Sequence, residues 1–264
     1  MSMQTRTYWS YGNMTYRDET FGPDAGVSLW QTCPISALLD PSVAHVFYDD
    51  FFQQNATKGT ADDQWTIVED DGAGGTDAMQ DAAGGIYKHF CDGDDNDEAY
   101  LLSTNECWKI AAGKSLWFEC RAAFTEGNTN DMNWALGLSD QAGANMIVDN
   151  GAGPAASYDG CAFWNLENAL TVSFETSNAA TQSTATSCGS HVSGTFANYG
   201  FWVRTESASD TVAVVTPYVN GTAYTARNIT LAGLEEMHFF IGVKSDGNAE
   251  EAFSIDYLKI VQIR

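Results

Sequence analysis

The sequence predicts an all-β protein built as an antiparallel sandwich of two sheets. From residue 49 onward, short runs of apolar and β-branched residues alternate with turns at the spacing typical of sandwiches. Asn220 and Gly221 stand between two such runs and favour the type I′ turn of a tight hairpin. No stretch shows the period of a long amphipathic helix. Residues 252–262 form a last clean strand, so we expect the first and last strands of the sandwich to pair.

Each predicted strand is a run with a period of two residues. Residues 115–125 are typical, because small or apolar side chains occupy every second position, as the buried face of a strand requires. Segments rich in Gly, Asn and Asp, which favour turns, separate many of the runs. In chain order the predicted strands are 46–52, 64–69, 85–91, 98–104, 107–110, 115–125, 132–139, 144–149, 160–165, 169–175, 191–194, 200–206, 211–219, 222–227, 236–244 and 252–262.

Residues 1–48 differ from the rest and predict an irregular N-terminal arm, which leaves 49–264 as the sandwich domain. The arm has aromatic residues scattered among Gly, Asn and Thr, without the period of a helix or a strand. Such a segment either drapes over its own domain or docks on a neighbour, because exposed aromatic rings are costly. We expect docking through the candidate partner-binding residues Trp9, Tyr11, Tyr16, Phe21 and Trp30.

The net charge of the chain limits the kinds of partner that it can bind. The chain of 264 residues has 12 Lys and Arg against 35 Asp and Glu, which gives a net charge of −23 and a pI near 4.1. Phosphate backbones are repelled by such a protein, so nucleic acid is not expected as a partner. The sequence shows neither a signal peptide nor an apolar run long enough to span a bilayer, so we expect synthesis in a cytosol and no membrane partner.

The sequence offers no pattern typical of a catalytic site. It lacks Glu-x-Asp-x-x-Glu, which sets a nucleophile and a general acid on one strand face in sandwich glycoside hydrolases. The four histidines are scattered, without a Gly-x-Ser-x-Gly pattern. Six cysteines show no spacing that suits zinc. We therefore predict no enzymatic activity and no obligatory cofactor.

One dense acidic cluster, residues 92–98, suggests a calcium site. Ca²⁺ needs six to eight oxygen ligands, and alternate positions on a short loop can converge on one ion. The candidate metal ligands are Asp92, Asp94, Asn96 and Glu98. The alternative is a solvated acidic hairpin tip, because the order of residues is not that of an EF-hand.

Two tryptophans in predicted strands, Trp117 and Trp134, suggest a second kind of site. A ring on an open sheet face can serve as a platform for a sugar, whereas core packing is the more frequent fate of tryptophan.

Segments at strand ends and turns resemble a known group of proteins. Residues 49–51, 84–87, 96–101, 116–121, 133–140 and 255–260 resemble the capsid decoration or cement proteins of tailed bacteriophages, which have a concanavalin A-like jelly-roll domain. These segments specify a fold better than a function, and no catalytic residue carries over. The arm lies outside the resemblance.

The resemblance implies a virion structural protein. It places the chain on the outer capsid surface, bound to the major capsid protein and present there as a homo-oligomer. The alternative function is a lectin-like module that binds glycans.

Overall fold

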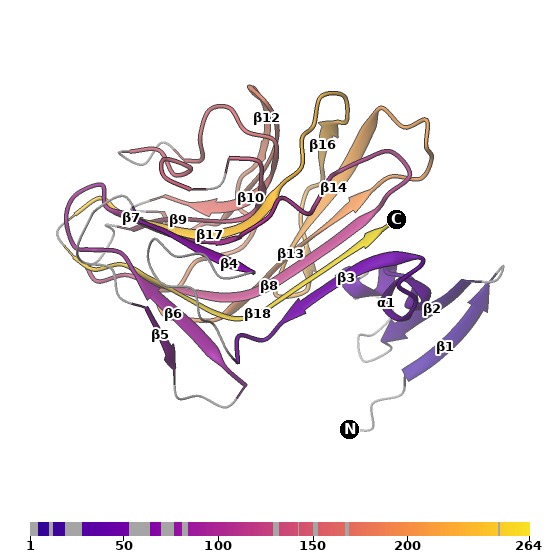
Figure 1. Ribbon diagram of the computed structural model, residues 1–264, viewed down its shortest axis with the longest axis horizontal. Coiled ribbons are helices and arrows are strands. Elements are labelled where there is room, and N and C mark those ends of the chain that lie inside the picture. Colours follow the sequence, from indigo (N-terminus) through magenta and orange to yellow (C-terminus); the bar gives the residue numbers. More distant parts are fainter. Residues whose placement is uncertain are drawn as a thin grey trace.

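The computed structural model describes residues 5–10, 13–18, 28–52, 64–69, 77–80, 84–128, 132–141, 143–149, 153–166, 169–247 and 249–264; for 5–10, 13–18 and 77–80 it describes the backbone. Two antiparallel sheets face each other across one core, as the sequence predicted (Figure 1). The seven-stranded sheet has the order β12 (Thr181–Ala185), β11 (Ser173–Asn178), β10 (Gly160–Asn165), β9 (Met132–Ser139), β17 (His238–Ser245), β7 (Glu98–Ser103) and β4 (Trp65–Glu69).

The nine-stranded sheet forms the other layer. Its main path is β15 (Thr222–Ala223), β14 (Val212–Val219), β13 (Ala197–Arg204), β8 (Leu116–Thr125), β18 (Ala252–Ile263), β6 (Ile86–Phe90) and β5 (Asp77–Gln80). Beside this path, β16 (Arg227–Thr230) pairs with β14, and β3 (Ala44–Asp49) pairs with β18. The pairing of Val46 with Val261 confirms that the first strand of the sandwich meets the last.

The core lies between the sheets and is rich in aromatic rings. Phe118 and Phe201, on neighbouring strands of the nine-stranded sheet, stack with centroids 4.5 Å apart. Phe124 reaches across to Trp134 of the other sheet, with centroids 4.0 Å apart. Trp134 is fully buried, so it is a core residue and no sugar platform. Burying each such ring contributes about 1.5–3 kcal/mol.

Residues 28–44 cover the outer face of the nine-stranded sheet. They contain a 3-10 helix, η1 (Leu29–Thr32), and a short helix, α1 (Ile35–Leu39). Trp117 lies beneath them, buried, and its Nε1 donates to Thr32 Oγ1 at 2.7 Å. This part of the predicted arm therefore drapes over its own domain. The apolar residues that pack together here are Leu29, Cys33, Ala37, Ala44, Trp117, Tyr218 and Val261.

The arm also contains a hairpin that the sequence did not predict. Strands β1 (Thr5–Ser10) and β2 (Asn13–Asp18) pair with each other, and β2 lies against η1 and α1. The scattered aromatic and polar residues of the arm show no strand period, so the sequence pattern did not indicate this pair.

Three predicted strands are wrong. No strand forms at 107–110, 144–149 or 191–194. Isolated bridges are the most that occurs within or next to these segments, such as the one between Ile147 and Pro154. Segment 144–149 has the residues of a strand because Met146 and Ile147 are buried against the outer face of the seven-stranded sheet. No helix among the described residues is long and apolar enough to cross a membrane.

Candidate functional site

The outer face of the seven-stranded sheet carries an apolar cluster with a polar pocket beside it. The described parts of segment 140–158 cross this face, and Met146, Ile147 and Tyr158 pack on Ala135, Ala162 and Phe240. The segment therefore covers this part of the face.

A buried ion network anchors the covering segment. Lys244 on β17 pairs with Glu98 on β7 at 3.5 Å and also with Asp149 of the covering segment. Glu98 accepts the Tyr100 hydroxyl at 2.7 Å and the backbone N–H of Asn145. Burial lowers the pKa of Lys244, but the hydrogen bond to Asp149 and the attraction of both carboxylates outweigh it, so the pKa is raised.

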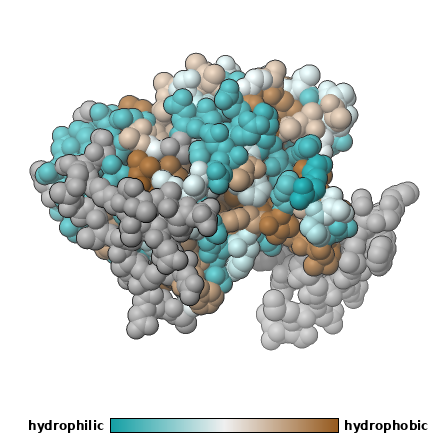
Figure 2. Space-filling view, in the orientation of Figure 1, coloured by the Kyte–Doolittle hydropathy of each residue, from teal (hydrophilic) through white to brown (hydrophobic). Residues whose placement is uncertain are grey.

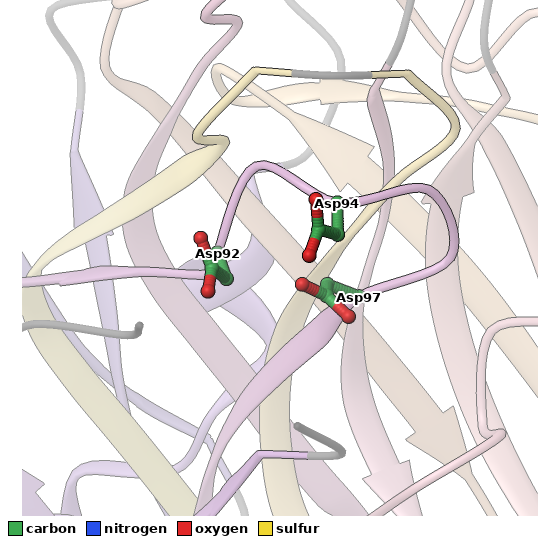
Figure 3. A group of neighbouring side chains, drawn as sticks. All are labelled: Asp92, Asp94 and Asp97. Atoms are coloured by element: carbon green, nitrogen blue, oxygen red, sulfur yellow. The ribbon is translucent and has the colours of Figure 1, made fainter. Parts of the chain in front are cut away.

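This network changes the predicted set of calcium ligands. Glu98 points away from the 92–98 loop, toward the outer face of the sheet, because side chains alternate along a strand. Asp97 joins Asp92 and Asp94 instead, and their carboxylate oxygens lie within 4.8 Å of one another (Figure 3). The assignment of Glu98 as a ligand is therefore wrong.

Asn96 holds the shape of the acidic loop. Its backbone is left-handed, with φ of 68°, and its N–H donates to the Ser245 carbonyl at 2.8 Å. Its Oδ1 is buried and accepts no hydrogen bond from the described residues. Calcium binding by this loop stays a prediction.

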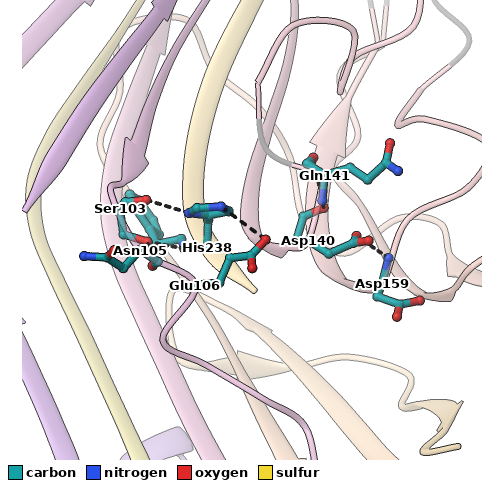
Figure 4. A network of polar contacts seen from close by, with 9 residues as sticks. Ser103, Asn105, Glu106, Asp140, Gln141, Asp159 and His238 are labelled. Atoms are coloured by element: carbon teal, nitrogen blue, oxygen red, sulfur yellow. Dashed lines mark hydrogen bonds and ion pairs between the residues drawn. The ribbon is translucent and has the colours of Figure 1, made fainter. Parts of the chain in front are cut away.

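A polar pocket opens where β9 ends. It has a volume of about 300 Å³, and we call it the 140–146 pocket; its lining is Asp140, Gln141, Gly143, Ala144, Asn145 and Met146. Asp140 Oδ1 accepts the Asp159 N–H at 2.6 Å, which fixes the carboxylate (Figure 4). Burial raises the pKa of Asp140, with the Asp159 charge adding to this and backbone hydrogen bonds opposing it.

A histidine lies at the same end of the sheet. His238 Nδ1 contacts the Ser103 carbonyl at 2.6 Å, and its Nε2 lies 3.4 Å from Glu106 (Figure 4). The Ser103 hydroxyl donates to the Asn105 carbonyl and accepts the Phe239 N–H. The hydroxyl is thus directed away from the histidine, and the group is not a Ser-His-acid triad.

Exposed apolar side chains lie on α1, on β3 and just after β3. Leu39 is 74% exposed, Phe52 63%, Tyr48 59% and Val46 46%. Figure 2 shows hydrophobic residues over the region of α1. We call these four residues the α1–β3 patch.

The predicted partner-binding residues are described only in part. Trp30 is half-buried against its own domain, with Lys259 Nζ 4.1 Å from the centre of its ring. The side chains of Trp9 and Tyr16, and Tyr11 and Phe21 altogether, lie outside the described residues. Binding of a partner by the arm stays a prediction.

Known structures share this fold. The architecture is that of the concanavalin A-like jelly rolls. An endo-1,3-beta-glucanase from Streptomyces sioyaensis has a TM-score of 0.57 and 13% identity, over 84% of this chain and 97% of that one. Peanut lectin has a TM-score of 0.54 and 14% identity, over 83% and 97%.

A third similar structure is the carbohydrate recognition domain of Emp47p, with a TM-score of 0.52 and 11% identity over 84% of this chain and 97% of that domain. At these identities the likeness concerns the fold alone. No family model matches the sequence. No curated protein matches it either.

The sequence pattern did not indicate the 140–146 pocket. Asp140, Gln141 and Asn145 are unremarkable as a string, since residues of this kind also fill ordinary turns. One signal was present: three polar side chains interleaved with glycine and alanine directly after a fully buried strand, β9. A polar loop that follows a buried strand sits at a sheet end, where binding residues often lie.

Proposed function

We propose that the protein is a carbohydrate-binding domain without catalytic activity, and that the 140–146 pocket holds a neutral sugar. The observation that carries the proposal is the donor set of this pocket. Asp140 offers a fixed acceptor, and the side-chain amides of Gln141 and Asn145 offer donors and acceptors together. A hydroxyl-rich ligand matches both, because each hydroxyl donates and accepts.

Charge and size favour the same ligand class. The pocket contains one carboxylate and no cation in its lining, and the chain carries a net charge of −23, so anionic ligands are disfavoured. About 300 Å³ is at the lower limit of ligand sites, which suits one sugar ring rather than a long chain. The glucanase and the lectins of this fold act on or bind carbohydrates by their names, which supports the proposal.

The carboxylates on this face support binding rather than hydrolysis. A glycoside hydrolase needs two carboxyl groups across the scissile bond, one of which gives up its proton. Asp159 accepts the N–H groups of Ala179 and Glu235, and Glu175 accepts the hydroxyls of Tyr158 and Thr184. Because these donors hold the carboxylates in place, neither is set up to exchange a proton with a substrate.

The test is a titration with a panel of neutral hexoses and their short oligomers, in which the NMR chemical shifts of the protein are measured at each sugar concentration. We expect at least one sugar to shift the resonances of the 140–146 pocket, and Asp140→Asn to weaken its binding about tenfold or more. Asp95→Asn, an exposed residue of the acidic loop, is the matched control and should bind normally. If no sugar shifts these resonances, or the two variants bind alike, the proposal fails.

A second candidate function is decoration of a virus capsid, as a homo-oligomer bound to the major capsid protein. The α1–β3 patch favours it, because four of the exposed large apolar side chains of the described residues belong to it, and groups of such side chains mark interaction sites. Its test is co-purification with assembled particles in stoichiometric amount. Replacing Tyr48 and Phe52 by Ser should abolish the association, while Leu170→Ser, an exposed apolar residue elsewhere, should not.

A further inference from the structure

An apolar pocket lies between the two sheets, apart from the sugar pocket on the outer face. It has a volume of about 210 Å³ and opens to solvent beside exposed residues. Phe239 contributes from the seven-stranded sheet, and Leu258 and Ile260 contribute from β18 of the other sheet. The remaining lining residues are Phe47, Gln64, Trp65, Ser103, Asn105, Cys107 and Trp108.

Aromatic rings shape the inside of this pocket. Phe47 meets Trp65 edge to face at 5.9 Å and Trp108 at 6.5 Å, and Trp65 meets Phe239 in the same way at 5.7 Å. The Trp65 Nε1 donates to Asp49 at 2.9 Å, so the indole is locked in its orientation. The rings that line the pocket are therefore held in place, and a further aromatic ring in the free volume can pack on them edge to face or offset.

The residues that line the pocket also determine how polar a bound molecule can be. Cys107 at the mouth is its only ionisable residue, and the other polar residues are Gln64, Asn105 and Ser103. An apolar cavity of about 150 Å³ is known to hold a benzene molecule in place of water. A neutral ring with one polar substituent fits both the apolar interior and the polar mouth.

We propose that this pocket binds small neutral molecules of one aromatic ring, with the ring packed against Phe47, Trp65 and Trp108 and a polar substituent at the mouth. The proposal is independent of sugar binding, since the two pockets share no residue. It gives this sandwich a second ligand site inside its core layer.

Cys107 provides a direct test. It is the only exposed thiol, whereas the other five are buried. Benzyl methanethiosulfonate therefore attaches a benzyl group to Cys107 through a disulfide, and dithiothreitol removes it. Methyl methanethiosulfonate is the matched control, because it makes the same disulfide with a methyl group that is too small to fill the pocket.

The probe is 4-fluorophenol, observed by fluorine NMR line broadening with the full chain. We expect binding to the untreated and the methyl-modified protein, binding weakened about tenfold or more after benzyl modification, and recovery with dithiothreitol. Circular dichroism shows that each modified protein stays folded. A variant with Asn105→Trp at the exposed mouth should weaken binding without thiol chemistry.

Three results would overturn the proposal. The first is no line broadening with the untreated protein. The second is equal binding after benzyl modification, which would place the probe elsewhere. The third is equally strong binding of 4-fluorobenzoate, since an anion does not suit a neutral pocket in a protein of net charge −23.

Discussion

Glu98 and Lys244 stand directly opposite each other on neighbouring strands, and both side chains are almost fully buried, at 0% and 1% exposure. Buried charges are tolerated only when they are paired and hydrogen-bonded. Tyr100 and the Asn145 N–H complete the shell of Glu98, and Tyr100 in turn accepts the Ile147 N–H at 3.0 Å. These contacts hold the segment that carries the 140–146 pocket.

Lys244→Met should therefore destabilise the protein strongly. The change leaves Glu98 as a buried charge without its cation, which costs about 3–5 kcal/mol. Guanidinium unfolding measures the loss. The double variant Glu98→Gln with Lys244→Met removes both charges and should recover part of the stability; if it is less stable than the single variant, the two charges do not act as a pair.

His191 gives the stability of the protein a dependence on pH. Burial lowers its pKa below the ordinary value of 6.5, although Glu126, 3.7 Å away, opposes the shift. The unfolded chain then binds the proton more readily than the folded one, so the free energy of unfolding falls as the pH drops below about 6.5. The free energy of unfolding levels off once the pH is below the pKa of His191 in the folded state.

Urea unfolding between pH 7.5 and 5.5 measures this effect. His191→Gln should flatten the profile over this range, with the other three histidines serving as an internal reference in both proteins. A profile with unchanged slope would show that the protonation of His191 does not limit stability.

At the scale of elements, the sequence predicts those strands and turns that the local alternation of apolar and polar residues determines. β9 and β10 were predicted at the bounds observed, and the turn at Asn220 and Gly221 is confirmed by φ angles of 49° and 77°. Strand β12 was missed, because its outer residues are exposed and polar. The sequence predicts a strand at 144–149 although the segment lies on the face of a sheet, because burial on that face selects the same apolar residues as a place within the sheet.

The candidate sites could likewise be predicted only where their residues are close together in the sequence. Asp92 and Asp94 could be grouped from the sequence because they lie on one short loop. The exchange of Glu98 for Asp97 depends on which residue begins β7, and one residue of difference reverses every side chain. The apolar pocket joins residues from Phe47 to Ile260, and such a distant set needs the fold.

Calcium should stabilise the protein if the acidic loop binds it. Binding to the folded state alone raises the melting temperature by mass action, so the melt in millimolar Ca²⁺ should lie above that in chelator. Asp94→Asn should abolish the shift. Asp95→Asn changes the same charge on the same loop outside the three-carboxylate group, so it should keep the shift. Equal melts with Ca²⁺ and with chelator would favour the solvated hairpin tip.

At the scale of the whole molecule, the predicted division at residue 48 does not match the packing of the described residues. Residues 28–44 bury Trp117, Tyr218 and Val261, which otherwise face solvent on the outer side of the nine-stranded sheet. Strand β3 then adds its hydrogen bonds to β18. The sandwich and this part of the arm therefore form one packed unit, and a boundary before residue 28 suits the contacts better.

Two truncations separate these parts of the arm. Removing residues 1–27 leaves the cover over Trp117 in place, so the free energy of unfolding should stay within about 1 kcal/mol of the full chain. Removing residues 1–43 exposes three large side chains at about 1.5–3 kcal/mol each, so it should lower stability by several kcal/mol. Guanidinium unfolding with circular dichroism measures both. Equal stability of the two truncations would show that residues 28–43 add little to the core, and the predicted boundary at 48 would then describe the folding unit.

A particle-binding assay with the protein that lacks residues 1–27 tests the predicted docking role of the arm. Because that protein keeps its core intact, loss of binding would assign the docking role to residues 1–27 and not to a damaged fold.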